Sequence, residues 1–272
     1  MSQTDTSRAG TTRRREQLVN MVEQNRSVDD LAVAFGVSPS TIRRDLATLA
    51  AASRILRTLG GAVAAPRVEV SWHDKATAQA DAKQDIAAQA AALVPDGAVV
   101  FLDAGTSVAA VAAKLADNPT LTLVTNGLSA AVAAADAQAT LIVLGGRLRR
   151  PNAGFTGVLT NYALDLVHPQ IAFLGCDGID PELGLNCPDI ELASAKQNMM
   201  QRCPSSWILA DHTKFARTEL FAYWAKLSSA TGVITDSVTA TSQAGQLDAL
   251  RANKHAVIVA PYITNQPAGS TA

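Results

Sequence analysis

Residues 27–49 read SVDDLAVAFGVSPSTIRRDLATL, and this stretch decides the fold of the N-terminal part of the chain. Ser27 followed three residues later by Asp30 is a capping-box pattern that starts a helix, with Asp in place of the usual Glu. Gly36 suits the left-handed residue that ends such a helix. Ser38, followed by proline, suits the N-cap of the next helix. Two helices joined by so short a turn are typical of a helix-turn-helix.

The second helix of this pair has an apolar face and a basic face. At 100° per residue, Ile42, Leu46 and Leu49 fall on one face, which would pack on the preceding helices. Asp45 lies near this buried side, so we expect it to have a structural partner rather than a DNA contact. The opposite face carries small residues and arginines, which allows a helix to enter a major groove closely and donate to guanine.

A small hairpin is predicted directly after this helix. Residues 54–58 read RILRT and two glycines follow at 60–61, a pattern that suits a wing with arginines for phosphate contacts. The expected DNA contacts of the helix and the wing are Ser38, Ser40, Thr41, Arg43, Arg44, Arg54 and Arg57. The expected partner is double-stranded operator DNA, read by an oligomer because one short helix covers too few base pairs.

Charge is distributed unevenly along the chain. Residues 1–67 contain ten arginines, no lysine and six acidic residues, a net charge of +4, and the remainder carries −5. A basic head on an acidic body suggests that the head contacts a polyanion. Charge alone would equally fit a solvated arginine pair on an ordinary three-helix unit. Turn spacing, capping and wing together favour DNA binding.

The three cysteines and the N-terminal residues bear on the compartment. Cys176, Cys187 and Cys203 are odd in number and lack metal-ligand spacing, so we expect reduced thiols and no metal site. The first 15 residues are polar and arginine-rich, unlike a signal peptide, and no apolar run approaches the ~20 residues of a membrane helix. We expect a cytoplasmic protein, associated with the nucleoid when it binds DNA, with no membrane partner and no cofactor.

The rest of the chain alternates short apolar runs with alanine-rich helical stretches. The runs are continuously apolar, as expected for parallel strands buried on both faces, so we predict an α/β domain with a mostly parallel sheet. The predicted strands are 98–102, 121–124, 141–144, 171–174, 207–210, 232–235 and 256–260, and the helices are 83–93, 107–116, 128–135, 192–202 and 243–252. The predicted organisation is a disordered tail over 1–11, a winged helix-turn-helix domain over 12–65, a linker over 66–80, the α/β domain over 81–262 and a flexible tail over 263–272.

Polar motifs follow five of these strands, at the points where the strands end. In a parallel sheet such ends lie along one edge, where open α/β folds bind ligands. The motifs are Asp103-Ala104-Gly105-Thr106-Ser107, Thr125-Asn126-Gly127, Gly145-Gly146-Arg147, Gly175-Cys176-Asp177-Gly178 and Asp211-His212-Thr213-Lys214. Each motif alone also suits a turn for steric reasons, whereas five at one edge favour a ligand site.

The chemistry of these motifs suits a phosphorylated sugar. Gly105 allows close backbone approach, and the amides of Thr106 and Ser107 stand at a helix N-terminus, which favours an anion. Carboxylates accept hydrogen bonds from sugar hydroxyls, and Lys214 supplies a positive charge. The expected effector contacts are Asp103, Gly105, Thr106, Ser107, Asn126, Gly145, Gly146, Gly175, Asp177, Gly178, Asp211 and Lys214. His212 is either a pocket residue or an oriented loop residue, and Trp72 is expected to be a core or interface anchor.

The chain resembles the DeoR family of bacterial regulators over about residues 12–262. The likeness is carried by Leu31-Ala32-Val33-Ala34-Phe35-Gly36-Val37-Ser38, Thr41-Ile42-Arg43-Arg44-Asp45-Leu46 and Arg57-Thr58-Leu59-Gly60-Gly61-Ala62, with Leu59 where the family often has His. The resemblance implies a sensor domain similar to ribose-5-phosphate isomerases that binds phosphorylated sugars without turnover. The resemblance implies effector contacts at Asp103, Gly105, Thr106, Asn126, Gly146, Gly175, Asp177, Asp211 and Lys214, and adds Lys83 to them.

Together these observations predict a ligand-controlled transcription factor that represses a sugar-utilisation operon and has no catalytic residues. Two alternatives stay open. An isomerase-class enzyme fused to a DNA-binding domain would need a general base, and Asp103, Asp177 and Lys214 could line such a site. A DNA-binding module whose body only oligomerises is disfavoured by the five motifs at one edge.

Overall fold

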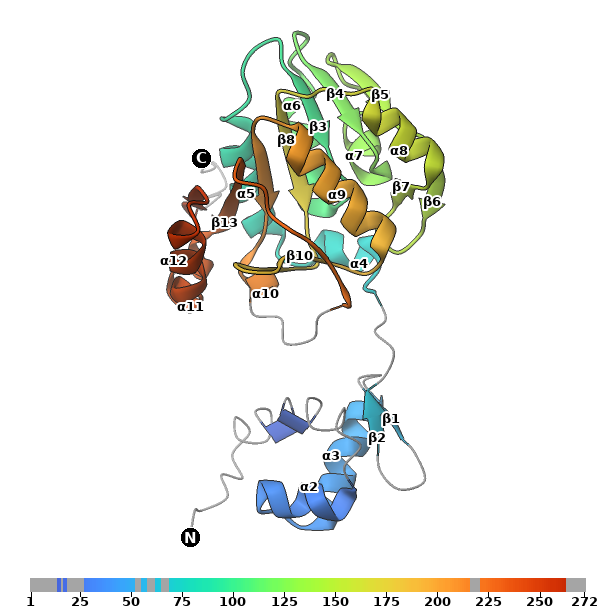
Figure 1. The fold of residues 1–272 in the computed structure, drawn as a ribbon, viewed down its shortest axis with the longest axis vertical. Coiled ribbons are helices and arrows are strands. Elements are labelled where there is room, and N and C mark those ends of the chain that lie inside the picture. Colours follow the sequence, from blue (N-terminus) through green and yellow to red (C-terminus); the bar gives the residue numbers. More distant parts are fainter. Residues whose placement is uncertain are drawn as a thin grey trace, which may run out of the picture. The chain divides into compact units, whose positions relative to one another are not determined.

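The computed structural model describes residues 14–15, 17–18, 27–51, 55–57, 62–64, 69–215 and 221–262. The chain divides into two compact units, one over residues 1–68 and one over residues 69–272. Figure 1 shows each unit as a ribbon coloured along the sequence. Each unit is described by itself below.

The N-terminal unit contains the predicted helix-turn-helix. Helix α2 (Val28–Phe35) begins at a complete capping box between Ser27 and Asp30 and ends at Gly36, whose φ of 62° is left-handed. Helix α3 (Pro39–Ala51) follows, and the Ser38 hydroxyl accepts a hydrogen bond from the Thr41 amide at 3.2 Å. These three predictions are confirmed.

The core of this unit and its hairpin also follow the sequence pattern. The buried apolar side chains are Leu18, Leu31, Ala32, Ile42, Leu46 and Leu49, which confirms the predicted inner face of α3. Strands β1 (Ile55–Arg57) and β2 (Ala62–Ala64) pair antiparallel as the predicted wing. Of the predicted first helix, the structure describes residues 14–15 and 17–18, which are helical.

The C-terminal unit is built on a seven-stranded sheet in which every pairing is parallel. Its strands, in spatial order, are β14 (Val257–Ala260), β13 (Thr231–Asp236), β11 (Ser206–Leu209), β8 (Ile171–Gly175), β3 (Val99–Leu102), β4 (Thr122–Thr125) and β5 (Thr140–Val143). All seven coincide with predicted strands to within one or two residues, so the predicted fold class is confirmed.

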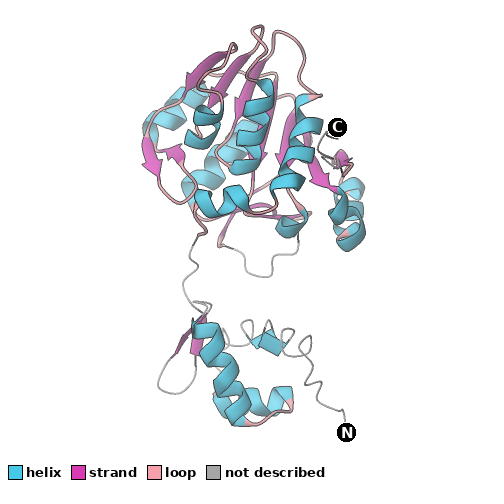
Figure 2. Ribbon diagram, turned by 180° about the vertical axis from the view of Figure 1, so that it is seen from behind, coloured by secondary structure: helices cyan, strands magenta, loops and turns pink. Residues whose placement is uncertain are grey.

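Helices cover both faces of this sheet (Figures 1 and 2). One core joins α5 (Ala80–Ala91), α6 (Thr106–Leu115) and α7 (Leu128–Ala133) to one face. The other joins α8 (Val158–Asp165), α9 (Ile190–Arg202) and α12 (Ala244–Ala252) to the opposite face. The remaining helices are α4 (Trp72–Thr77), α10 (His212–Phe215) and α11 (Ser237–Ser242).

Two small antiparallel sheets lie beside the main one. Strands β12 (Tyr223–Ala225), β10 (Gly184–Cys187) and β9 (Gly178–Asp180) form the first, and β6 (Arg147–Arg149) pairs with β7 (Gly154–Thr156) in the second. Neither sheet, nor α4 and α8, was predicted from the sequence. Helix α4 falls within the predicted linker over 66–80, yet it belongs to the C-terminal unit, where the Trp72 amide donates to the Pro151 carbonyl at 2.7 Å.

The strand order places the ligand crevice. From β3 the chain winds outward through β4 to β5, and then returns to β8 on the other side of β3 and winds outward through β11 and β13 to β14. The order therefore reverses between β3 and β8, which pair directly from Val100↔Ile171 to Leu102↔Phe173. In open α/β sheets, ligands bind outside the carboxyl ends of the strands at such a switch point.

Candidate functional site

The outer face of α3 is the candidate DNA-reading surface. Ser38, Ser40, Arg43 and Arg44 are exposed and Thr41 is half-buried. The Ser38 hydroxyl lies 2.7 Å from the Ser40 hydroxyl and 2.9 Å from the Thr41 hydroxyl, so these three groups form one polar cluster at the start of the helix. Predicted Arg57 lies on β1, and Arg54 falls outside the described residues.

Asp45 has the structural role that was predicted for it. Its side chain is 3% exposed and accepts from Arg14 and Arg15, each at 2.8 Å. A buried carboxylate between two guanidinium groups holds the first helical segment against α3. Arg43 and Arg44 are exposed on the outer face of α3, whereas Arg14 and Arg15 are engaged within the chain.

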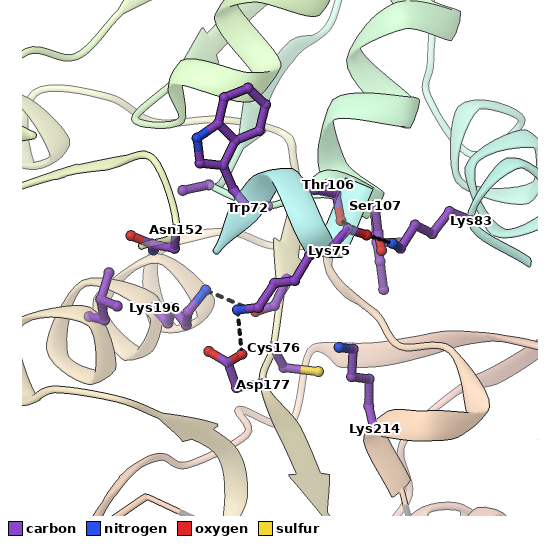
Figure 3. Close-up of a pocket in the computed structure, with 15 residues that line it drawn as sticks. Trp72, Lys75, Lys83, Thr106, Ser107, Asn152, Cys176, Asp177, Lys196 and Lys214 are labelled. Carbon is purple, nitrogen blue, oxygen red and sulfur yellow. Dashed lines mark hydrogen bonds and ion pairs between the residues drawn. The ribbon is translucent and has the colours of Figure 1, made fainter. Parts of the chain in front are cut away.

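A cavity of about 580 Å³, including its open mouth, lies at the β3–β8 switch point (Figure 3). Its wall is formed by the turns after β3 and β8, by the α4 segment, by the β6–β7 turn, by the end of β11, and by side chains from α5, α9 and α10. The lining residues are Trp72, Lys75, Lys83, Ala104, Gly105, Thr106, Ser107, Asn152, Gly175, Cys176, Asp177, Leu192, Leu209, Lys196 and Lys214.

One part of the cavity is arranged for an anion. Gly105, with φ of 156°, precedes α6, so the first amides of this helix, at Thr106 and Ser107, open onto the cavity. A side chain added at Gly105 would point toward Gly175, whose Cα is 3.9 Å away and which also lines the cavity. Lys214 brings an ammonium group to the same space, and no carboxylate within the described ranges pairs with it at 4.0 Å or less.

A short segment between residues 69 and 78, here called the strap, closes another side of the cavity. Within it, Ser71 caps α4 by accepting from the Asp74 amide. Lys75 donates to Asp177 at 2.7 Å across the cavity wall. The Lys75 carbonyl accepts from the Lys83 ammonium, which also donates to the Ala78 carbonyl. The strap is therefore tied to the sensor body through lysines that line the cavity.

The start of the strap is held by a buried ion pair. Glu69, whose side chain is 6% exposed, pairs with Arg149 of β6 and lies 3.8 Å from the Lys75 ammonium. Burial raises the pKa of Glu69, and Arg149 opposes that rise. Arg149 also pairs with Asp189, the N-cap of α9. A network of charges thus runs from the first residue of the C-terminal unit to the cavity.

A buried pair supports the floor of the cavity. Lys196 of α9 pairs with Asp103, and their side chains are 8% and 4% exposed. The same ammonium donates to the Gly175 carbonyl at 2.8 Å, and Asp103 accepts from the Gly175 amide at 3.2 Å. Burial would lower the pKa of Lys196, but the Asp103 carboxylate more than offsets burial and raises it. The pair joins the turns after β3 and β8.

Seven predicted effector contacts line the cavity: Lys83, Gly105, Thr106, Ser107, Gly175, Asp177 and Lys214. Six predicted contacts do not line it: Asp103, Asn126, Gly145, Gly146, Gly178 and Asp211. Three of them have polar groups that bond within the chain, although the buried Oδ1 of Asn126 has no hydrogen-bond partner among the described residues. Asp103 is the counterion of Lys196, and Asp211 accepts from the Thr213 amide at 3.0 Å. Asn126 donates to the Phe155 carbonyl at 3.4 Å.

Of the three remaining glycines of that group, Gly146 has a steric reason to be glycine. Gly145 offers its carbonyl to the Thr160 hydroxyl at 2.9 Å, and a side chain at Gly146 would overlap Thr160. Gly178 begins the buried strand β9. His212, for which two roles were open, is oriented by Asp236, 2.9 Å from its Nδ1, and does not line the cavity.

Several lining residues were missed from the sequence, chiefly Trp72, Lys75, Asn152, Cys176, Leu192 and Lys196. The sequence contained a pattern that could have predicted two of these features, helix α4 and the inward position of Lys196. Ser71 followed by Asp74 is a capping pattern for α4, and Lys196 falls on the same inward stripe as buried Leu192, Met199 and Met200. A lysine on an apolar stripe needs a buried counterion. Trp72, expected to be an anchor, lines the cavity.

Burial tunes two further cavity groups. It lowers the pKa of Lys83, which the Asp211 charge partly counteracts. It raises the pKa of the Cys176 thiol to about 12, so this group stays protonated at neutral pH. Within the described ranges, no three His, Cys, Asp or Glu side chains gather as a metal site, and no helix is long and apolar enough to cross a bilayer.

Comparisons with known proteins agree with both units. Residues 14–68 match the model of the DeoR-like helix-turn-helix domain, and residues 78–237 match that of the DeoR C-terminal sensor domain. A protein of Escherichia coli O157:H7 assigned as transcriptional repressor of the aga operon is 34% identical, over 81% of this chain and 86% of its own.

Other relatives are similarly distant. The glycerol-3-phosphate regulon repressor of Escherichia coli K12 is 32% identical over 83% of this chain and 91% of its own. The solved ribose 5-phosphate isomerase A of Methanocaldococcus jannaschii covers 51% of this chain and 56% of its own, at 19% identity and a TM-score of 0.38. From the two family matches and the sequence relatives, the chain belongs to the DeoR family of DNA-binding transcriptional regulators.

Proposed function

We propose that this regulator represses a sugar-utilisation operon by binding operator DNA, and that a phosphorylated sugar in the cavity releases it. The observation that carries the proposal is the anion-binding corner formed by the α6 N-terminus, Lys214 and Lys83. A phosphate dianion satisfies helix N-terminal amides and ammonium groups together. Trp72 and Leu209 offer an apolar wall for the carbon face of a sugar, and Asn152 and Asp177 offer polar groups for its hydroxyls.

The proposal includes binding without turnover. Sugar-phosphate isomerisation needs a general base beside the carbonyl. Asp177 is the one carboxylate among the lining residues, and Lys75 holds it in an ion pair at 2.7 Å. Asp103, the other candidate base, is the buried counterion of Lys196. Both carboxylates therefore have partners within the chain that fix their orientation and occupy their oxygens. The relatives, which are transcriptional regulators, point the same way.

The strap supplies a route by which the cavity would act on DNA binding. An anion beside Lys75 competes with Asp177 and Glu69 for the same ammonium group. Glu69 directly follows Val68, the last residue of the unit that contains the helix-turn-helix. A ligand shifts a two-state regulator only by its differential affinity for the two states. If Lys75 of the strap exchanged its carboxylate partners for the bound anion, the two states would differ in their affinity for that anion.

Operator release tests the proposal. Fluorescence anisotropy of DNA from upstream of the protein's own gene is measured while a panel of phosphorylated sugars, the parent sugars and inorganic phosphate is titrated. We expect at least one phosphorylated sugar to release the DNA and its unphosphorylated parent to fail. Lys214→Ala should raise the releasing concentration about tenfold or more, because a charge-assisted contact is worth about 1.5–3 kcal/mol.

Lys114→Ala, an exposed lysine on the same helix as the anion-binding amides, is the matched control. It should release DNA at the wild-type concentration. A folded Lys214→Ala variant that also released DNA at the wild-type concentration would place the effector elsewhere. Detectable isomerisation of any sugar in the panel would overturn the assignment as a non-catalytic sensor.

A further inference from the structure

The outward side of α8 is an apolar surface with no function in the cavity. Its large side chains are Val158, Leu159, Tyr162 and Leu166, which are 84, 73, 66 and 68% exposed. At 100° per residue these four positions fall within one arc of about 100°, the width of a helix face that normally packs against protein. They are here called the α8 face. None of the four lines the effector cavity.

Helix α8 is apolar on both sides, which sets it apart from an ordinary surface helix. Its inward side buries Leu164 in the same core as Leu144, next to the end of β5. Thr160, also buried, donates to the Gly145 carbonyl at 2.9 Å. Asn161 and Asp165 form a polar strip on one side of the α8 face, so the helix carries two apolar stripes rather than one. The described chain encloses only one side of this helix.

The edge strand of the main sheet carries further exposed apolar side chains. Strand β5 is the last strand on that side, and its Ile142 and Val143 are each 44% exposed. Figure 1 shows α8 and β5 together at this edge, with α11 and α12 at the opposite one. Monomeric proteins rarely expose a contiguous apolar patch of more than a few hundred Å². Four large apolar side chains exposed on one helix face therefore suit contact with another protein surface.

The charges near the α8 face select the kind of partner. Asp165 is the one charged residue within α8, and it pairs with Arg202 of α9 at 2.8 Å. Arg147 of β6 pairs with Glu191 of α9 at 2.6 Å. These ion pairs close within the chain, so Asp165 and Arg147 are both neutralised by partners of the same chain. A neutral apolar surface does not suit nucleic acid, and it meets an identical surface without repulsion.

We infer that the α8 face is where a second copy of this chain binds, in an isologous contact between two α8 helices. The need for a second copy comes from the N-terminal unit. One recognition helix of 13 residues contacts only a few base pairs, and helix-turn-helix proteins reach specificity by placing two such helices on two half-sites. This inference goes beyond the proposed function, because it holds whatever effector occupies the cavity.

Sedimentation velocity of the full chain at micromolar concentration tests it. Leu159→Glu and Tyr162→Glu each place a carboxylate in the middle of the surface, where a twofold axis would bring two such groups together. We expect the wild type to be a dimer or larger and each variant to have half the wild-type mass or less. Affinity for a two-half-site operator should fall by about 10²-fold or more, because the second head no longer binds intramolecularly.

Val238→Glu is the matched control, since Val238 is a 48% exposed apolar residue of α11 at the opposite edge of the sheet. It should keep the wild-type mass and operator affinity. Far-UV circular dichroism and Trp fluorescence establish that all variants are folded. A monomeric wild type, or wild-type mass for both folded α8 variants, would overturn the inference. So would dissociation by Val238→Glu with the α8 variants intact.

Discussion

Replacing Lys196 by methionine should destabilise the C-terminal unit more than any other loss of a cavity lysine. Methionine keeps the length of the side chain but removes the charge, which leaves Asp103 as a carboxylate that is 4% exposed and has lost its counterion. The Gly175 carbonyl loses a donor at the same time. Breaking a buried ion pair on one side costs about 3–5 kcal/mol, and both partners are too buried for solvent to reduce this much.

That loss is large beside the total stability of a domain, about 5–15 kcal/mol. For a unit of this size it corresponds to a fall in Tm of about 6–20 °C. Trp72, Trp207 and Trp224 are the only tryptophans of the chain, and all lie in the C-terminal unit. Urea unfolding of the full chain followed by Trp fluorescence therefore reports on this unit alone.

A variant that lacks both charges distinguishes the cost of an unpaired buried carboxylate from the cost of altered packing. Asp103→Asn combined with Lys196→Met leaves no buried charge, so the double variant should recover at least 1 kcal/mol relative to Lys196→Met alone. Lys114→Met, an exposed lysine, should change stability by about 0.5 kcal/mol or less. A loss below 1 kcal/mol for Lys196→Met, or a double variant no better than the single one, would refute the assignment of Asp103 as a structural counterion.

Three further outcomes are expected. Arg44→Ala should weaken operator binding by about 1–3 kcal/mol and leave random DNA much less affected, as measured by anisotropy on both DNAs; equal losses on both would reduce Arg44 to a phosphate contact. Asp45→Asn should break the ion pairs that join α3 to Arg14 and Arg15, so the α3 amides should exchange hydrogen faster. Unchanged protection of these amides would contradict the role of the ion pairs. Because burial lowers the pKa of Lys83, raising the pH should discharge this group before ordinary lysines. The dissociation constant of the releasing sugar phosphate should then rise as the pH passes that pKa, and a constant value between pH 7 and 10 would remove Lys83 from the site.

The main sheet could be predicted closely because its strands are buried on both faces. Runs such as Val99–Leu102 and Ile171–Gly175 are apolar at every position, and helices on both sides require this. The small sheets have no such signal. Strand β10 reads GLNC and β9 reads GID, and each is buried by its neighbours rather than by its own composition. Helix α8 escaped prediction because its outward side is as apolar as its inward side.

The turn motifs and the resemblance together predicted seven residues that line the cavity and six that do not. Asp, Asn and Gly follow parallel strands both to bind ligands and to complete the turns themselves, and residue type does not separate these roles. Asn126 and Asp211 complete local hydrogen bonds, whereas Asp177 lines the cavity. What distinguishes a lining residue from a turn residue is whether its turn faces the β3–β8 switch point.

The residues missed in the cavity come from segments distant in sequence. Lys75 meets Asp177 across 102 residues, and Lys196 meets Asp103 across 93. Such pairings depend on strand order, which periodicity does not reveal. The Lys196 pair shows what would have sufficed. The helix pattern places Lys196 against the sheet, where its charge requires a counterion. Once β8 is known to pair with β3, the turns after these two strands must be neighbours. Asp103, the carboxylate directly after β3, is then the candidate counterion. Strand order is therefore the information that distinguishes residues lining the cavity from residues that hold the surrounding turns in place. No further motif in the sequence would have made this distinction as well.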